Sequence, residues 1–212
     1  YYKTFMWPKS FWYKVYEPFI RKAAGLGVGS TEKDKERYEH KYEYCDLLVT
    51  GSGPSGLASA YAAAKSGAKV ILAEDKPRFG GSLLTDDVNI DNLSGKQWAD
   101  KIISELKEMP NVTLKNRSQV FGYYDHNMLV MFERTGDHLE KKSKYHPRQR
   151  LWYIRSKEVI LSTGSIERPI VFGNNDTPGI FLASAAKEYM KVYGVVVGKK
   201  PLIFTNNDSA YE

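Results

Sequence analysis

The chain has 212 residues, of which 42% are hydrophobic and 26% are charged, a composition that excludes a disordered chain and is typical of a globular protein. Its formal net charge of +6 comes from basic residues scattered along the chain, so we expect no nucleic-acid partner. A single cysteine, Cys45, excludes an internal disulfide framework, and no window offers the roughly 20 apolar residues that span a bilayer, so we expect a cytoplasmic protein with no membrane partner.

The first part of the chain predicts a helix followed by a charged arm. Apolar residues recur at helical spacing over residues 10–24, although Pro18 must kink or shorten that helix. Charges of alternating sign without an apolar period follow over residues 31–43, a pattern typical of a connecting arm. We therefore expect residues 1–44 to form an N-terminal helix and a charged connector.

A strand, a turn, a helix and a second strand come next within about thirty residues. The apolar run 45–50 predicts a strand, and the alanine-rich run 54–66 predicts a helix that Gly67 ends. A second apolar strand is expected at 69–73. Two parallel strands with a right-handed crossover are the expected outcome.

A second crossover follows the first. Residues 94–97 match a capping box at the start of a helix, which Pro110 must end. The apolar run 112–115 is then expected to form a third parallel strand.

Three antiparallel strands are expected after that, with His126 and its neighbours Asp125 and Asn127 turning the first hairpin. These strands are predicted at 118–124, 128–135 and 150–156, and a separate buried parallel strand at 158–163. A helix at 182–193 closed by Gly194 and a last strand at 200–205 complete the pattern.

The glycines of "VTGSGPSGLASA" carry the chemistry of this region. Gly51 permits a tight turn out of the strand, Gly53 lets a pyrophosphate approach the backbone, and Gly56 lets the helix lie close to the sheet. Glu74 stands at the end of the second strand, where its carboxylate can accept hydrogen bonds from an adenosine ribose and would repel a 2'-phosphate. This pattern favours NAD or FAD over NADP.

Two further glycine sites strengthen the prediction. Gly80 and Gly81 follow at a distance where they can approach a dinucleotide, and Thr163 with Gly164 ends the later parallel strand at the same crevice. Three such sites separated by a three-stranded meander resemble the first dinucleotide domain of the glutathione-reductase-like flavoproteins. The resemblance implies an α/β fold with a Rossmann-like parallel sheet, of the type with two dinucleotide domains and an inserted antiparallel meander.

On this basis we expect residues 45–197 to form the dinucleotide-binding domain, with the meander at about 118–156. The chain opens at Tyr1 and stops at Glu212 after a strand-like run, so we expect a fragment of a longer protein. Residues 198–212 are then the truncated start of a second, degenerate nucleotide-type domain. Where a second glycine fingerprint is expected, the sequence has Asn206 and Asn207, so we expect no usual binding of a reducing nucleotide there.

Longer strings carry a more specific resemblance. The chain resembles the alpha subunits of the heterotetrameric sarcosine oxidases through "YYKTFMWP" (1–8), "FGYYDHN" (121–127), "PRQRLW" (147–152), "STGSIERPIVFGNND" (162–176) and "FTNNDSAY" (204–211). The resemblance implies that NAD is held without covalent attachment in the pocket where other flavoproteins hold FAD. It also implies that Val120 meets the adenine through its backbone. The cofactor-binding residues expected in all are Gly51, Ser52, Gly53, Pro54, Ser55, Gly56, Glu74, Asp75, Gly80, Gly81, Val120, Thr163 and Gly164.

The resemblance further implies a hetero-oligomer with beta, gamma and delta subunits. FAD on the beta subunit would oxidise the amine, and a covalent FMN between the alpha and beta subunits would pass electrons to oxygen. The whole complex would convert sarcosine to glycine, form peroxide and transfer the one-carbon unit to tetrahydrofolate. Folate handling would belong to a further domain of the alpha chain.

Other hypotheses stay open at this stage. The same glycines could hold FAD in a related amine, opine or hydroxyproline dehydrogenase, or the segment could be an assembly module with an empty pocket. Glu167 and Arg168 could hold the loop after the last parallel strand by a salt bridge or meet a partner subunit. We find no metal-ligand cluster and no activated nucleophile in the sequence, and we assign no catalytic residue.

Overall fold

The computed structural model describes residues 7–27 and 29–211. Residues 1–6, which belong to the first string of the resemblance, and Glu212 lie outside the described residues. The chain divides between Lys35 and Glu36 into two compact units, which are described separately.

The first unit contains an irregular helical segment. A 3-10 turn, η1 (Lys9–Phe11), leads into a π-helical turn, η2 (Trp12–Tyr16), and then into α2 (Glu17–Ala23). Pro18 is the second residue of α2, directly after the π-helical turn, and it has no N–H to continue the helical hydrogen bonds from that turn. The helix expected at 10–24 is therefore present, with its regular part shortened as Pro18 predicts.

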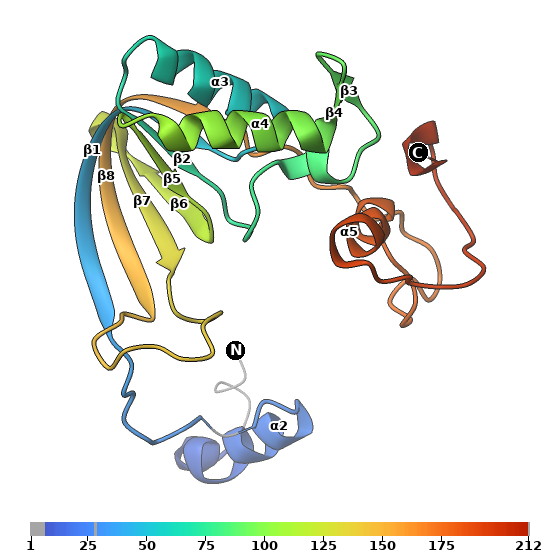
Figure 1. Cartoon of the computed structure of the whole chain (residues 1–212). Helices are drawn as coiled ribbons and strands as arrows, with labels where there is room; N and C mark the ends of the chain where they lie inside the picture. Colours follow the sequence, from blue (N-terminus) through green and yellow to red (C-terminus); the bar gives the residue numbers. More distant parts are fainter. Residues whose placement is uncertain (1–6, 28, 212) are drawn as a thin grey trace. The chain divides into compact units, whose positions relative to one another are not determined.

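The second unit is built on one six-stranded sheet with the strand order β5-β2-β1-β8-β7-β6 (Figure 1). Strands β5, β2, β1 and β8 are parallel, whereas β7 and β6 continue the sheet as antiparallel strands. The predicted α/β fold with a parallel sheet and an antiparallel extension is confirmed. The strands are β1 (Tyr38–Thr50), β2 (Val70–Ala73), β5 (Val112–Lys115), β6 (Ser118–Tyr124), β7 (Met128–Arg134) and β8 (Gln149–Leu161).

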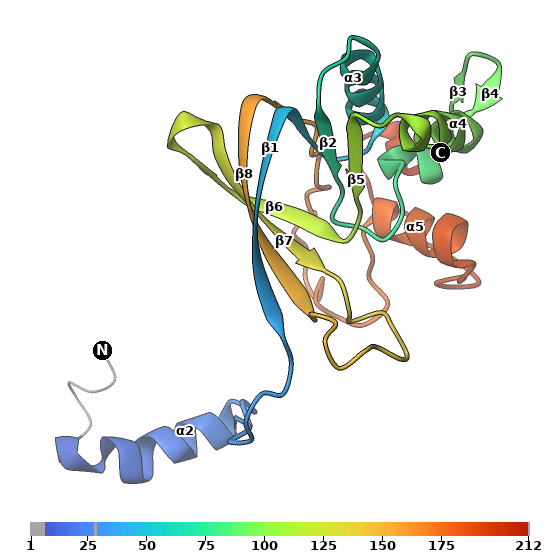
Figure 2. The same ribbon diagram turned by 60° about the vertical axis from the view of Figure 1, so that its left-hand side comes forward.

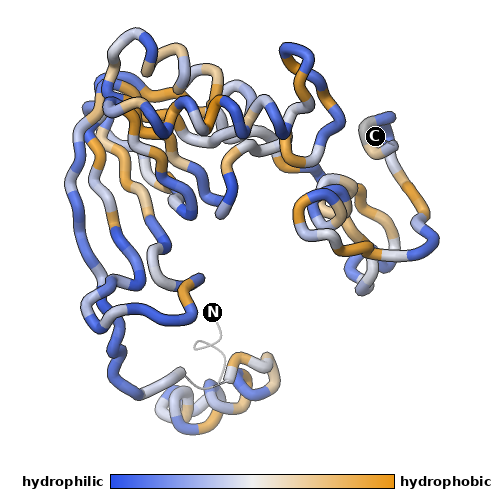
Figure 3. Tube along the Cα trace, in the orientation of Figure 1, coloured by the Kyte–Doolittle hydropathy of each residue, from blue (hydrophilic) through white to orange (hydrophobic). Residues whose placement is uncertain are grey.

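Two strand predictions were wrong. Residues 38–44, expected to belong to a charged arm, form the first half of β1, and the strands expected at 150–156 and 158–163 are one continuous strand, β8. The two strands pair in parallel from Tyr38 with Gln149 to Thr50 with Leu161. The first half of β1 is largely exposed and mostly hydrophilic (Figure 3), although Tyr38, Tyr42 and Tyr44 alternate along it with charged residues. This alternation of aromatic with charged residues is typical of a strand, and the prediction of a charged arm did not use it.

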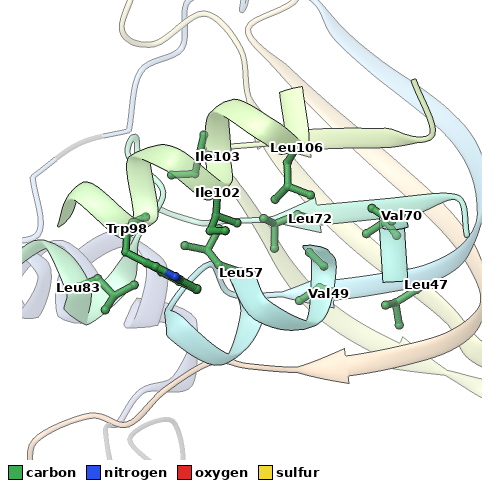
Figure 4. Close-up of a cluster of buried hydrophobic side chains, with 13 residues drawn as sticks. Leu47, Val49, Leu57, Val70, Leu72, Leu83, Trp98, Ile102, Ile103 and Leu106 are labelled. Carbon is green, nitrogen blue, oxygen red and sulfur yellow. The ribbon is translucent and has the colours of Figure 1, made fainter. Parts of the chain in front are cut away.

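Helices α3 (Pro54–Lys65) and α4 (Gly95–Glu108) cover one face of the parallel strands (Figures 1 and 2). The buried residues of α4 recur at helical spacing and lie against Leu57 of α3 and Leu72 of β2 (Figure 4). Each fully buried leucine of this kind contributes about 1.5–3 kcal/mol to folding. The buried residues that α4 adds to this core are Trp98, Ala99, Ile102, Ile103 and Leu106.

The opposite face of the sheet is covered by its own antiparallel extension. Strands β6 and β7 curl across this face (Figure 2), and Leu129 and Met131 of β7 contact Leu48 of β1 and Ile71 of β2. Cys45 belongs to this second core and is fully buried, where it acts as a small apolar residue. Strand β2 and the second half of β1 are thus enclosed on both faces, as their apolar sequences require.

The helix signals in the sequence are confirmed. Gly67 has a φ of +89° just after α3, and Gly194 has a φ of +68° at the end of α5 (Ala183–Tyr193), so each supplies the left-handed residue that ends a helix. At the start of α4, Ser94 and Gln97 form the complete capping box. Asp125–Asn127 form the turn η4, in which His126 is left-handed, as expected of turn residues.

Some elements differ from the prediction. The strand expected at 200–205 does not form, because no described strand lies beside it to complete a hydrogen-bonded ladder. A small hairpin, β3 (Asn89–Ile90) with β4 (Leu93–Ser94), was not expected from the sequence. The short helices η3 (Gly81–Leu84) and η5 (Asp208–Tyr211) complete the described elements. None of the described helices has the length and apolar composition of a membrane span.

Replacing Ser94 by alanine should destabilise the second unit by about 0.5–2 kcal/mol, because the amide of Gln97 loses its cap. Denaturant unfolding followed by circular dichroism measures this loss. Ser66→Ala is the control, because the exposed Ser66 hydroxyl caps no helix N-terminus. Equal stabilities of the two variants would contradict the assigned capping role.

The Cys45 thiol should be unreactive in the native protein. Burial raises the pKa of this thiol, and the side chain has no exposed surface. A disulfide reagent should therefore label Cys45 only after the protein is unfolded. Labelling of the folded chain at the rate of a free thiol would contradict the observed packing.

Candidate functional site

The turn from Gly51 to Gly56 lies at the carboxyl end of β1, between the two parallel neighbours β2 and β8. Gly53 is the N-cap of α3 and Pro54 is its first residue. The N–H groups of the first helical turn have no partner within the helix, and the helix dipole places partial positive charge there. Such a position is a general binding site for phosphate groups.

The chain itself explains two of the three glycines. Gly51 has a φ of +95°, and a Cβ there would overlap the carbonyl oxygen of Ser162. A Cβ at Gly56 would overlap the carbonyl oxygen of Gly51. These two glycines therefore allow the start of α3 and the end of β8 to lie directly against the end of β1.

Gly53 has a different environment. Its φ of −65° is open to any residue, and a Cβ built there meets no atom within 4 Å. The structure thus imposes no requirement for glycine at this position, whereas a ligand lying against the backbone would impose one. The open face of Gly53 fits the approach of a pyrophosphate.

The second glycine pair lies against the first. Gly81 has a φ of +54°, and a Cβ there would be 2.8 Å from the Cα of Gly53. The N–H of Gly80 donates to the hydroxyl of Ser52 at 3.0 Å. The predicted contact of both glycine segments with one ligand is therefore geometrically possible.

Glu74 follows directly after β2 and is buried, with only 7% of its surface exposed. Its Oε2 accepts from the N–H of Ser52 at 3.0 Å and from the Ser52 hydroxyl, and its Oε1 accepts from the N–H of Lys76 at 3.0 Å. Burial raises the pKa of Glu74, as does the neighbouring carboxyl of Asp75, while the donors from Ser52 and Lys76 oppose the rise. These internal bonds were not expected from the sequence.

Asp75 and Val120 lie on the side of the site formed by β2 and β6. The N–H of Ser118, at the start of β6, donates to the carbonyl of Glu74 at 2.8 Å. The exposed residue Asp75 accepts a hydrogen bond on its carbonyl from Arg134 of β7 at 2.6 Å. Val120 is half-buried, and the register shifts just after it, between Val120 and Gly122.

Of the residues that follow β8, Ser162 lies beside the glycine turn, whereas Gly164 is exposed. The N–H of Ser162 donates to the carbonyl of Thr50 at 2.7 Å, which holds the chain beside Gly51. Thr163 and Gly164 are at the end of this segment; Gly164 is exposed and has a φ of +67° with open space around it. Among buried side-chain oxygens of the described residues, that of Thr50 lacks a hydrogen-bond partner, one residue before the glycine turn.

Helix α5 is attached to the loop that carries Gly80 and Gly81, which the sequence did not indicate. Ion pairs join its charged residues to this loop: Lys76 with Glu188 at 2.7 Å, Lys187 with Asp86 at 3.2 Å and Lys191 with Asp87 at 2.8 Å. The carboxylate of Glu167 accepts from the N–H of Ser184 at 2.8 Å and caps α5. Glu167 thus holds the loop after β8 to α5 through backbone amides of the helix, and not through the expected salt bridge.

Residues 7–27 and 29–211 were also searched for a metal site and for a second ligand pocket. No group of three or more His, Cys, Asp or Glu side chains there could hold a metal ion. A hollow of about 510 Å³ lies at the edge of β5, lined by residues that include Pro77, Phe79 and Lys107. None of the predicted binding residues lines it, so the glycine turn remains the candidate site.

Comparisons with known proteins agree with this geometry. A family described as FAD dependent oxidoreductase matches residues 46–134. The chain is 47% identical over 211 residues to the alpha subunit of sarcosine oxidase from Rhizobium meliloti (strain 1021), covering 100% of this chain and 21% of the relative. It is 42% identical over 190 residues to the corresponding subunit from Corynebacterium sp. (strain U-96), covering 89% of this chain and 20% of the relative.

More distant proteins share the same architecture. One of the opine oxidase subunits of Agrobacterium tumefaciens (strain Ach5) is 26% identical over 174 residues, covering 76% of this chain and 33% of that protein. The crystal structure of L-proline dehydrogenase from P. horikoshii superposes with a TM-score of 0.61 at 24% identity, over 81% of this chain and 32% of the other. This likeness supports the fold alone.

The chain spans about a fifth of the length of the sarcosine oxidase relatives that it matches. The resemblance read from its sequence is confirmed over that span: the chain is similar to a segment of the sarcosine oxidase alpha subunits, and residues 46–134 match the FAD dependent oxidoreductases.

Proposed function

We propose that this chain is the dinucleotide-binding segment of the alpha subunit in a sarcosine oxidase and that it holds NAD on the turn from Gly51 to Gly56. The observation that carries the proposal is the environment of the glycines. Contacts within the chain account for Gly51 and Gly56, whereas the face of Gly53 is open beside the amides that begin α3. A pyrophosphate on that face would accept hydrogen bonds from those amides.

The remaining predicted residues surround the rest of the nucleotide. A carboxylate has about four lone-pair positions, and three of those on Glu74 are occupied by Ser52 and Lys76. The free position on Oε1 can accept from one ribose hydroxyl, with the exposed Asp75 beside it. Val120 would meet the adenine, Gly80 and Gly81 the phosphates, and Thr163 with Gly164 the far side of the crevice. The two neighbouring acids would disfavour a 2'-phosphate, which supports NAD over NADP.

In this proposal NAD is a structural cofactor and the redox chemistry takes place elsewhere in the complex. Asn206 and Asn207 stand where a second nucleotide site would need glycine, which supports the absence of a usual hydride route through this chain. FAD on a beta subunit, together with FMN shared between the two chains, would carry the oxidation of sarcosine to glycine. Oxygen would yield peroxide, and tetrahydrofolate would take the one-carbon unit. Gamma and delta subunits would complete the hetero-oligomer in the cytoplasm.

A second candidate is FAD in the same pocket. The match of residues 46–134 to the FAD dependent oxidoreductases favours it, and so does the similarity to an opine oxidase. Both nucleotides contain adenosine diphosphate, so the glycine turn and Glu74 would serve either one. In this case the chain would be the FAD-binding subunit of an amine, opine or hydroxyproline dehydrogenase.

The nucleotide released from the intact complex decides between the candidates. Denaturing the purified complex and separating the supernatant by chromatography should yield NAD together with flavin. The Gly53→Ala complex should lose NAD selectively, because the new methyl group would occupy the space of the pyrophosphate, and NAD affinity should fall at least about tenfold.

Gly173→Ala is the matched control for this variant. Gly173 also lacks a neighbour within 4 Å of a built Cβ and has an ordinary φ, but it lies outside the site. The control complex should retain its nucleotides in full. Release of FAD without NAD from the wild type, and loss of FAD alone from Gly53→Ala, would replace the first candidate by the second.

Gly56→Ala should act on folding instead of on binding alone. The added Cβ would overlap the carbonyl oxygen of Gly51, which belongs to the backbone and cannot move aside cheaply. Overpacking of this kind costs about 1–3 kcal/mol. Denaturant unfolding without nucleotide should show this loss for Gly56→Ala and a near-native midpoint for Gly53→Ala. Equal midpoints would refute the different constraints assigned to the two glycines.

A further inference from the structure

We propose that Ser52 is a positioning residue whose buried hydroxyl fixes Glu74 and the Gly80 segment relative to the first glycine turn. The inference rests on the proposed function, because the groups that Ser52 joins are those expected to meet the nucleotide. Ser52 was expected to contact the cofactor itself. The structure gives its side chain a different place.

The hydroxyl of Ser52 is committed to partners within the chain. It donates to Oε2 of Glu74 at 2.5 Å and accepts from the N–H of Gly80 at 3.0 Å. The backbone N–H of Ser52 donates to the same Oε2 at 3.0 Å. Since Ser52 has no exposed surface, its hydroxyl cannot also reach a ligand in the crevice.

One oxygen atom therefore connects three separate segments: the first glycine turn, the end of β2 and the second glycine pair. The close approach of Gly81 to Gly53 limits how near the two turns can lie, but it does not fix their direction. Hydrogen bonds do fix direction, and those to a carboxylate are stronger than neutral ones. Without the hydroxyl, the buried N–H of Gly80 would lose its acceptor and Glu74 would lose one donor.

The test compares Ser52→Ala with wild type in the intact complex after its nucleotide has been removed. Hydrogen exchange followed by mass spectrometry should show faster exchange in the peptide that contains residues 80–84, without a general increase over β1 and β8. Calorimetric titration with NAD, and separately with FAD, should show an affinity at least about tenfold lower for the nucleotide that wild type binds, in line with the loss of a hydrogen bond to a charged group.

Ser66→Ala is the control, because Ser66 has an exposed hydroxyl that lies outside the site and donates to the carbonyl of Ala63. It should change neither the local exchange nor the affinity. If Ser52→Ala does not fold, Ser52→Cys serves in its place, since a thiol fills the space of the hydroxyl, although it is somewhat larger, and is only a weak acceptor. Unchanged exchange at residues 80–84 together with wild-type affinity would overturn the inference, even if the melting temperature fell.

Failure of the proposed function would give a different result. If wild type binds neither NAD nor FAD, the proposed function fails. The exchange of residues 80–84 in the ligand-free variant then still decides whether Ser52 fixes the second glycine segment. Faster exchange there supports the positioning role, and unchanged exchange removes it.

Discussion

The close approach of backbone to backbone at the end of β1 is the constraint on which the rest of the site depends. Helix α3 can begin directly behind β1 because no Cβ at Gly56 separates it from the carbonyl of Gly51. The end of β8 lies equally close because Gly51 has no Cβ either. These contacts place the first amides of α3 at the carboxyl edge of the sheet, which is where parallel sheets bind ligands.

Burial of Glu74 connects this edge to the second glycine pair. An acid at the end of a strand would be expected to point freely into the crevice. Here its carboxylate is enclosed and accepts from Ser52 and Lys76, so burial and hydrogen bonding act on it in opposite directions. The carboxylate that is proposed to bind the ribose therefore also maintains the shape of the glycine turn. A substitution of Glu74 would remove both the binding role and the structural role at once.

The sequence predicted those parts of the molecule that local chemistry determines. Gly67, Gly194 and the Ser94 capping box mark helix ends through their own conformations and hydrogen bonds, and all three are confirmed. The first half of β1 was mistaken for a charged arm, because its charged residues alternate with tyrosines that stay largely exposed, and its partner β8 lies more than a hundred residues later. The hydroxyl of Ser52 was missed for a similar reason, since its partners Glu74 and Gly80 become neighbours only in the folded chain.

The two ends of the second unit are held by different forces. Around α3 and α4, fully buried apolar side chains supply the stability, and salt does not screen their contribution. Helix α5 contains no buried residue and is attached through ion pairs such as that between Lys191 and Asp87, both of which are exposed. Exposed pairs contribute about 0–1 kcal/mol each and are screened by salt. The loop with Gly80 and Gly81 lies between these two regions, so its order depends on the rigid core through Ser52 and the buried Leu83, and only weakly on α5.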